Sequence, residues 1–103
     1  MNTILNSYMH INIEIRKMVK HIGLEANSIC ILYLLEKHDM HIQQIADKIG
    51  ITISTVTRLL DRLEKDGYVL RHKYYSIDER RRYAILTYKG YEKYLGIKQW
   101  LIL

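Results

Sequence analysis

The 103-residue chain has one cysteine, no proline and no phenylalanine, and it lacks a long apolar run. With Cys30 alone there can be no disulfide framework within the chain, so only a bond between two subunits could use this thiol. No apolar run approaches the roughly 20 residues that cross a bilayer, and the start of the chain lacks the charged-then-apolar layout of a signal peptide. We therefore expect a cytoplasmic protein with no membrane partner.

The sequence also lacks the usual signatures of an enzyme. It has no glycine loop that could cradle a phosphate, no activated nucleophile set and no carboxylate cluster for a metal. His38 and His41 stand three residues apart, but a structural zinc site needs about four ligands, and Cys30 lies eight residues before His38. We predict no metal and no other cofactor, and we interpret both histidines as loop and helix-cap residues.

The apolar content and the charge distribution indicate how many domains the chain has and which kind of partner it binds. Apolar residues make up 49% of the chain and no proline-rich or glycine-rich stretch divides them, which predicts a single domain over residues 1–103. Residues 1–40 contain four basic and four acidic side chains, whereas residues 41–103 contain twelve and seven, so the net charge of +5 lies in the second part. This asymmetry favours a polyanionic partner there, although a mildly basic solvated surface is the alternative.

A heptad-like apolar seam runs along the first 22 residues. Its spacing alternates steps of four and three, which places the seam on one face of a long helix that packs on another helix. The partner helix can belong to the same chain or to a second subunit, and both alternatives stay open. Gly23 is placed to end the helix. The seam residues are Ile4, Tyr8, Ile11, Ile15, Met18 and Ile22.

The next apolar segment predicts a helix that Asn27 or Ser28 caps and that ends near Lys37. We expect Cys30 to be a small buried side chain of this helix, because free cysteine is among the most buried residue types. A redox switch and an intersubunit disulfide are the alternatives for this thiol. The other core candidates are Ile29, Leu32, Tyr33 and Leu35.

A short strand at residues 40–42 and a short helix at residues 43–49 are predicted next. Gly50 follows where the backbone must turn with a positive φ. This arrangement is typical of the first half of a helix-turn-helix, although two core helices joined by a glycine turn would give the same pattern. The inward positions are Ile45, Ala46, Ile49 and Ile51.

The stretch TISTVTRLLDRLEK, residues 52–65, predicts an amphipathic helix that Thr52 caps through its hydroxyl. Hydroxyls and arginine near the N-terminus of a helix can dock on phosphates and reach base edges, so we interpret this segment as a DNA-reading helix. Its inward residues are Val56, Leu59, Leu60 and Leu63. Its outward residues are Ser54, Thr55, Thr57, Arg58, Asp61 and Arg62.

Residues 69–75 and 82–86 predict two strands of a hairpin with a charged tip. Residues 71–82 contain five basic and two acidic side chains. Arginine at such a tip can enter the narrow, electronegative minor groove beside a reading helix, whereas an exposed basic turn without a partner is the alternative. The basic candidates are Lys73, Arg80, Arg81 and Arg82.

Together these segments resemble the winged-helix repressors of the multiple-antibiotic-resistance regulator (MarR) family, over about residues 24–90. One motif, IADKIGITISTVTRLLDRLEKDGYVLR at residues 45–71, is similar to the family's second helix, recognition helix, terminating glycine and following arginine. The other, DERRRYAILTYKG at residues 78–90, has an acidic-x-Arg tip, a Leu-Thr pair and a later glycine. Short versions of this fold also resemble proteins of archaeal viruses, for which the location would be the host cytoplasm.

The resemblance implies an α+β, mainly helical fold. It is a winged helix-turn-helix with a two-stranded wing, to which the short strand at residues 40–42 can add a third. The single domain would comprise an N-terminal dimerisation helix at residues 1–23, the winged core at residues 24–87 and a short C-terminal helix at residues 88–103.

The resemblance also implies a role for individual residues. Ser54, Thr55, Thr57 and Arg58 would face the major groove, with Arg62 next to them. Asp78 would orient Arg80 in the minor groove through a charge-assisted pair. Thr87 would cap the C-terminal helix, and Arg71 would make a structural or a phosphate contact. Independently of the resemblance, we expect phosphate contacts that make the affinity salt-sensitive from Lys48, Arg62, Arg71, Lys73 and Lys89.

The tail at residues 88–103 departs from the family, whose members usually continue into long C-terminal helices that build the dimer interface. This tail is apolar and must pack on something, because a short isolated helix is unstable in water. We expect the N-terminal seam and the tail to form a two-fold dimer, with Trp100 near its centre. The interface candidates are Ile4, Tyr8, Ile11, Ile15, Tyr94, Trp100 and Leu101.

The expected function is that of a homodimeric, sequence-specific transcription regulator that binds double-stranded DNA, acts as a repressor and is not an enzyme. A non-specific architectural DNA binder and a winged-helix protein-interaction module are the alternatives. The operator, the target genes, the direction of regulation and a small-molecule effector stay open.

Overall fold

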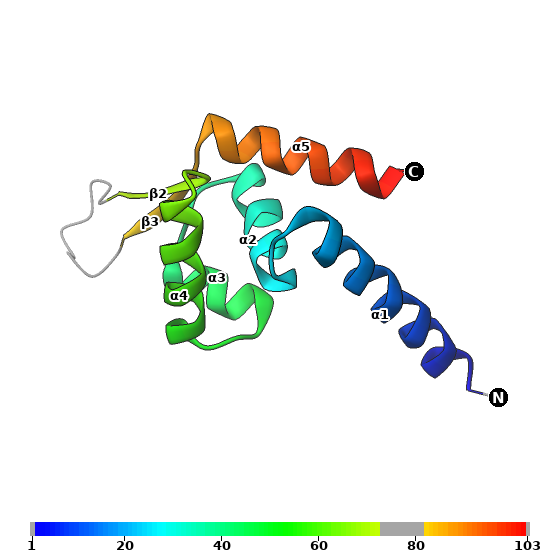
Figure 1. Cartoon of the computed structure of the whole chain (residues 1–103). Coiled ribbons are helices and arrows are strands. Elements are labelled where there is room, and N and C mark those ends of the chain that lie inside the picture. Colours follow the sequence, from blue (N-terminus) through cyan, green and yellow to red (C-terminus); the bar gives the residue numbers. More distant parts are fainter. Residues whose placement is uncertain (1, 73–81, 103) are drawn as a thin grey trace.

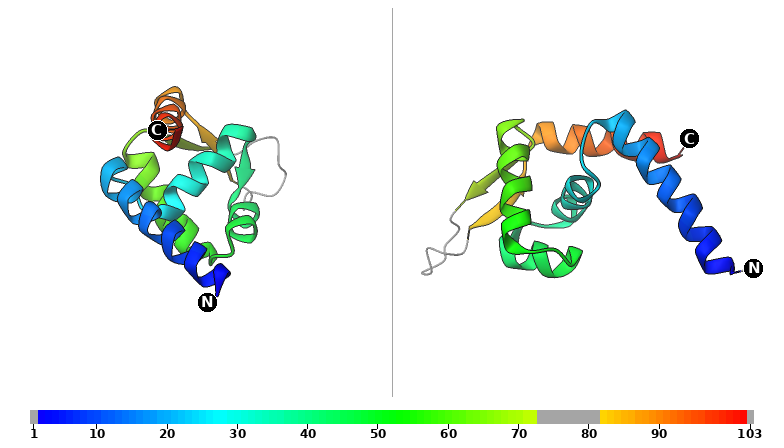
Figure 2. Two further views of the ribbon diagram at one scale, coloured as in Figure 1. Left: turned by 90° about the vertical axis from the view of Figure 1, so that its right-hand side faces the viewer. Right: turned by 60° about the horizontal axis from the view of Figure 1, so that its bottom comes forward.

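The structure is a computed structural model that describes residues 2–72 and 82–102 (Figure 1). The fold is α+β and mainly helical, as predicted. Figures 1 and 2 show α1 projecting away from a body that the other elements build. The helices are α1 (Thr3–Ile22), α2 (Ala26–Lys37), α3 (Ile42–Ile49), α4 (Ile53–Lys65) and α5 (Tyr88–Ile102), and the strands are β1 (Met40–His41), β2 (Val69–His72) and β3 (Tyr83–Leu86).

The helices α3 and α4 form the predicted helix-turn-helix. His41 caps α3, since its Nδ1 accepts a hydrogen bond from the Gln44 amide at 3.3 Å and the Gln44 side chain accepts one from the His41 amide at 3.1 Å. Gly50 ends α3 with a φ of +79°, a conformation that most residues with a side chain rarely adopt. Thr52 caps α4, because its hydroxyl accepts from the Thr55 amide at 3.2 Å. These predicted caps and the predicted turn are confirmed.

One apolar core fixes α4 to the body. The inward face of α4 is at most 1% exposed, as predicted, and full burial of a Val or Leu side chain contributes about 1.5–3 kcal/mol. The helix therefore has a defined outward face. The core residues from α4 are Val56, Leu59, Leu60 and Leu63, and those around them include Ile31, Leu32, Ile45, Ala46, Val69 and Ala84.

The strands form an antiparallel sheet in the order β1-β3-β2. Arg71 pairs with Ala84 across the predicted hairpin, and Met40 pairs with Ala84 on the other side, so the third strand is present. Four predicted wing residues lie outside the described residues, together with the rest of the tip: Lys73, Asp78, Arg80 and Arg81.

The helix α2 corrects three expectations. It begins at Ala26 after the cap residue Glu25, so neither Asn27 nor Ser28 caps it. Tyr33 is 48% exposed and Cys30 is exposed, although both were expected in the core. The reason is geometric, because the helix packs through its residues Ser28, Ile29, Ile31, Leu32 and Leu35, and the two corrected positions fall on the opposite face.

The Cys30 thiol is nevertheless partly shielded from water. Surrounding atoms desolvate the sulfur and raise the pKa of the Cys30 thiol, which disfavours the reactive thiolate. This environment gives no support to a redox switch at this residue.

The helix α1 ends at Gly23, as predicted, and packs on the core through its C-terminal part, where Met18, Val19 and Ile22 are partly buried. Its N-terminal half is exposed, with Ile4 at 80% and Ile11 at 59%. Among the described helices none is long and apolar enough by itself to span a membrane; α1 and α2 meet that test only as a pair, which is bent by 82°.

The helix α5 begins at the predicted cap Thr87, whose hydroxyl accepts from the Gly90 amide at 3.0 Å. Tyr94, a predicted interface residue, is only 8% exposed because it packs in the core of its own chain. The Trp100 ring is half-buried and stacks on His21 of α1, with the two ring centroids 5.5 Å apart. Leu101 is 60% exposed. Little of Tyr94 is left for a partner subunit, whereas Leu101 is available.

Candidate nucleic-acid interface

Hydroxyl groups gather at the N-terminal end of α4. Thr52 Oγ1 lies 2.8 Å from Thr55 Oγ1 and 3.2 Å from Ser54 Oγ, so the three side chains form one cluster. Ser54 is exposed and Thr55 is half-buried. The cluster lies beside the first-turn amides, which carry the partial positive charge of the helix. This end of α4 can therefore bind phosphate oxygens or the acceptor atoms of base edges.

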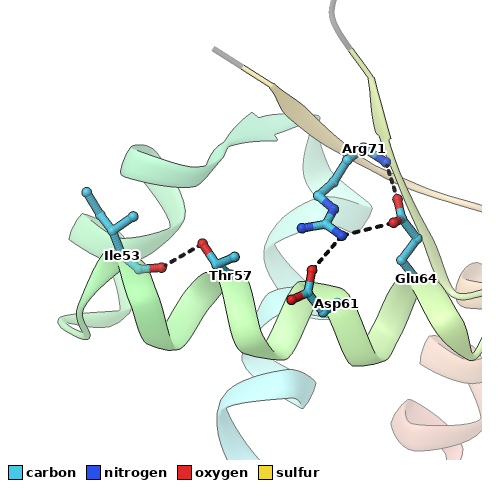
Figure 3. Close-up of polar contacts among 5 residues, drawn as sticks. All are labelled: Ile53, Thr57, Asp61, Glu64 and Arg71. Atoms are coloured by element: carbon cyan, nitrogen blue, oxygen red, sulfur yellow. Dashed lines mark hydrogen bonds and ion pairs between the residues drawn. The ribbon is translucent and has the colours of Figure 1, made fainter. Parts of the chain in front are cut away.

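Thr57 offers a different chemistry from its neighbours. Its hydroxyl donates a hydrogen bond to the Ile53 carbonyl at 3.0 Å, inside the helix (Figure 3). Because the hydroxyl proton is engaged in this hydrogen bond, Thr57 can offer DNA only the hydroxyl oxygen as an acceptor and the side-chain methyl group for apolar contact. The methyl group of a threonine suits the methyl group of thymine in the major groove.

The guanidinium of Arg58 pairs with Glu25, 33 residues earlier in the chain. Arg58 Nη1 lies 3.1 Å from Glu25 Oε2, and Arg58 Nη2 lies 3.5 Å from Glu25 Oε1. The two side chains are 61% and 50% exposed, so the pair contributes at most about 1 kcal/mol. Arg58 is thus on the outward side of α4, as predicted, but it is held by an acid there.

Arg71 makes structural contacts, which were one of its two predicted roles, and its phosphate contact stays a prediction. Its Nη2 lies 2.6 Å from Asp61 Oδ1 and 2.9 Å from Glu64 Oε1, and its amide donates to Glu64 Oε2 at 3.0 Å (Figure 3). The hydrogen bond from Arg71 lowers the pKa of Glu64, and the same bond raises the pKa of Arg71. The first strand of the wing is thereby joined to α4. A phosphate would have to share the guanidinium with both acids.

The remaining basic candidates lie at different places around α4. Arg62 is exposed on α4 itself, and Lys48 is exposed on α3. Arg82 is exposed just before β3, where its charge also lowers the pKa of Glu64. The Lys89 ammonium donates to the Asp66 carbonyl at 2.8 Å, so this residue supports the C-terminal end of α4. The phosphate contacts of Lys48, Arg62 and Lys89 and the role of Arg82 in the wing remain predictions.

A glycine brings α5 against the turn that follows α4. A Cβ atom at Gly90 would overlap the Tyr68 carbonyl oxygen and would lie 2.7 Å from Leu86 Cδ1. The Thr87 hydroxyl also donates to the Gly67 carbonyl at 2.6 Å. The later glycine of the second motif therefore has a packing role, since it lets α5 support the base of the wing.

Two acidic residues of this surface were not predicted from the sequence. Glu64 had a local signal, because Asp61 and Glu64 stand three residues apart on one side of a helix and a basic residue follows after the turn. Glu25 had no such signal. Its contact with Arg58 depends on how α2 packs beside α4, which periodicity does not specify.

The comparison with known proteins starts from the family model. The model described as MarR family matches residues 24–74. The transcriptional regulator MhqR of Bacillus subtilis (strain 168), which is of the helix-turn-helix type, is 34% identical over 85 residues, or 82% of this chain and 58% of MhqR. The chain belongs to the MarR family. YfiV of the same organism, another regulator of this type, is 41% identical over 56 residues, which are 53% of the MarR-family chain and 34% of YfiV.

A solved structure extends the likeness beyond residues 24–74. The crystal structure of NadR in complex with 4-hydroxyphenylacetate matches with a TM-score of 0.81 and 28% identity, and it covers 93% of this MarR-family chain and 68% of NadR. The predicted winged helix-turn-helix fold is confirmed. The chain spans little more than half of MhqR and about a third of YfiV.

Proposed function

We propose that this MarR-family chain is a homodimeric transcription regulator, which binds double-stranded DNA in a sequence-specific manner and acts as a repressor in the cytoplasm. The observation that carries the proposal is α4, whose inner face is buried while its N-terminal end presents a hydroxyl cluster beside Arg58. The relatives named above are regulators rather than enzymes, which supports a non-enzymatic function.

In this proposal α4 enters the major groove. Ser54, Thr55 and Arg58 contact base edges there, and Thr57 contributes its methyl group. The wing lies in the adjacent minor groove, where Asp78 orients Arg80. Contacts with the phosphates make the affinity strongly salt-dependent. The phosphate candidates are Lys48, Arg62, Arg71, Lys73 and Lys89, and the further candidates of the wing are Arg81 and Arg82.

The exposed face of α1 supports a second subunit. Its N-terminal half presents a run of apolar side chains around a hollow of about 350 Å³, which is lined by Thr3, Ile4, Ser7, Tyr8 and Ile11. Such a contiguous apolar face marks an interaction surface, and two copies of α1 can cover each other. With Leu101 at its edge, this dimer would present two reading helices to half-sites whose centres are about 10 bp apart.

A mobility-shift assay with fragments of genomic DNA tests the proposal. The wild-type protein should retard only some fragments. Arg58→Ala should weaken binding to these fragments by about 10- to 100-fold, because that is the affinity lost with one good base contact. Lys98→Ala, which removes an exposed positive charge from α5, is the matched control and should change the affinity far less. Equal retardation of all fragments would favour the architectural alternative, and no retardation at low salt would favour the protein-interaction alternative.

A further inference from the structure

Glu25 directs its carboxylate at the reading helix instead of capping its own helix. It is the cap residue of α2, and its carbonyl accepts from the Ile29 amide at 3.1 Å. A side chain at this position normally accepts a hydrogen bond from the first turn, but the Glu25 side chain makes none. Its two oxygens bind Nη1 and Nη2 of Arg58 instead.

The same edge of Arg58 is the one needed for DNA. A guanidinium recognises the O6 and N7 atoms of guanine through two parallel N–H groups, and it binds a carboxylate in the same bidentate manner. Glu25 and a guanine therefore cannot both occupy the Nη1 and Nη2 edge of Arg58. We propose that Glu25 is a competing partner that restrains Arg58 in the free protein and thereby limits the affinity of α4 for DNA.

This inference rests on the proposed function, because competition requires that Arg58 contacts DNA. The exposure of the pair fixes the size of the effect. Arg58 is 61% exposed and Glu25 is 50% exposed, so solvent screens their attraction and DNA can displace the acid. Removing the acid should tighten DNA binding by about two- to fivefold, which is the range of an exposed ion pair.

A double-mutant cycle separates this competition from a general effect of charge. Glu25→Gln keeps the size of the side chain and removes its charge, and Arg58→Gln removes the cation. The dissociation constant for one retarded fragment is measured by fluorescence anisotropy at a fixed salt concentration, for the wild type, both single variants and the double variant. We expect Glu25→Gln to tighten binding in the wild-type background and to have no effect in the Arg58→Gln background.

Two further variants control for folding and for charge. Glu25→Ser supplies a favoured cap residue for α2 while removing the pair, so it should tighten binding as Glu25→Gln does. Glu14→Gln removes an exposed acid that pairs with Lys17 on α1 at 3.3 Å, and it should leave the affinity unchanged.

The outcomes distinguish this inference from the proposed function. Equal tightening by Glu25→Gln in both backgrounds would contradict competition for Arg58, because the gain would then come from charge alone. Unchanged or weaker binding by Glu25→Gln, with normal binding by the wild type, would also overturn the inference while the proposed function stands. Absence of DNA binding by the wild type and every variant at low salt would overturn both.

Discussion

Arg71 Nη2 lies 2.9 Å from Glu64 Oε1, and this contact joins β2 to α4. The Arg71 amide bonds the other oxygen of the same carboxylate, so the strand is held at two points, and Asp61 provides a third (Figure 3). The Arg71 side chain is only 19% exposed, so water screens these contacts less than it screens the Arg58 pair. The base of the wing is therefore joined to the reading helix at three contacts.

Arg71→Ala should destabilise the fold because it leaves Asp61 and Glu64 without their shared cation. Hydrogen bonds to charged groups contribute about 1.5–3 kcal/mol, and the partial exposure of both acids reduces the expected loss to about 1–2 kcal/mol. Urea unfolding at neutral pH measures it. Arg62→Ala, at an exposed position on α4, is the control and should change the stability by no more than about 0.5 kcal/mol. Equal stability of the two variants would contradict the role of Arg71.

The pH dependence of stability should report the Glu64 contact. Arg71 lowers the pKa of Glu64 in the folded chain, so the stabilisation is present above the pKa of the unfolded chain, which is about 4 for glutamate. It is lost as the pH falls through the lowered folded pKa. Glu64→Gln should thus be less stable than the wild type at pH 7, and the two should converge as the pH falls below the lowered pKa of Glu64 in the folded chain.

Urea midpoints for both proteins across this range provide the measurement. Glu36→Gln, at an exposed position on α2, should keep a constant difference from the wild type. A constant difference for Glu64→Gln as well would show that the Arg71 contact does not favour its ionised form.

Two glycines of α5 form a matched pair for a packing test. Gly90→Ala places a Cβ atom onto the Tyr68 carbonyl, whereas a Cβ atom at Gly96 meets nothing within 4 Å. Both changes replace a glycine within α5 by alanine, a better helix former. Gly90→Ala should therefore cost about 1–3 kcal/mol, and Gly96→Ala should gain up to about 1 kcal/mol. Thermal unfolding should place the melting temperatures on opposite sides of the wild-type value, and a stable Gly90→Ala variant would refute the close approach.

The proposed dimer predicts the effect of a charge on α1. Ile11 is 59% exposed in the single chain, so Ile11→Glu leaves the fold of one chain intact but buries an unpaired carboxylate in an α1–α1 interface. Sedimentation equilibrium should show a dimer for the wild type and a dissociation constant at least about tenfold higher for Ile11→Glu. Tyr33→Gln changes an exposed ring on α2 and should remain dimeric. A monomeric wild-type protein would rule out this assembly.

Local patterns were sufficient to predict the reading helix. The spacing of Val56, Leu59 and Leu60 gave its buried face, Thr52 gave its start, and Gly50 gave the turn before it, because each signal depends on neighbours in sequence. The hairpin followed in the same way, whereas the Thr87 cap was expected only from the resemblance to the family. The two sequence motifs then connected these elements into one family fold.

Contacts between distant residues were not predictable in this way. Periodicity showed that Tyr94 belongs to an apolar face but not that α2 and the core of the same chain would cover it. The Tyr33 side chain was expected inside because α2 is apolar on most of its surface, which leaves its inner face poorly defined. Cys30 was expected inside because free cysteine is usually buried. The partners of Arg58 and Arg71 depend on the packing of α2 and β2 against α4, and this packing arises only in the folded chain.

Selection from a pool of random double-stranded DNA at about 150 mM salt tests the central claim most directly, namely that α4 reads base sequence. After several rounds the wild-type protein should enrich a near-palindromic site whose half-site centres are about 10 bp apart, and Arg58→Ala should lose the preference at one base pair in each half-site. Recovery of unenriched sequences by a protein that still binds the pool would contradict sequence-specific reading by α4.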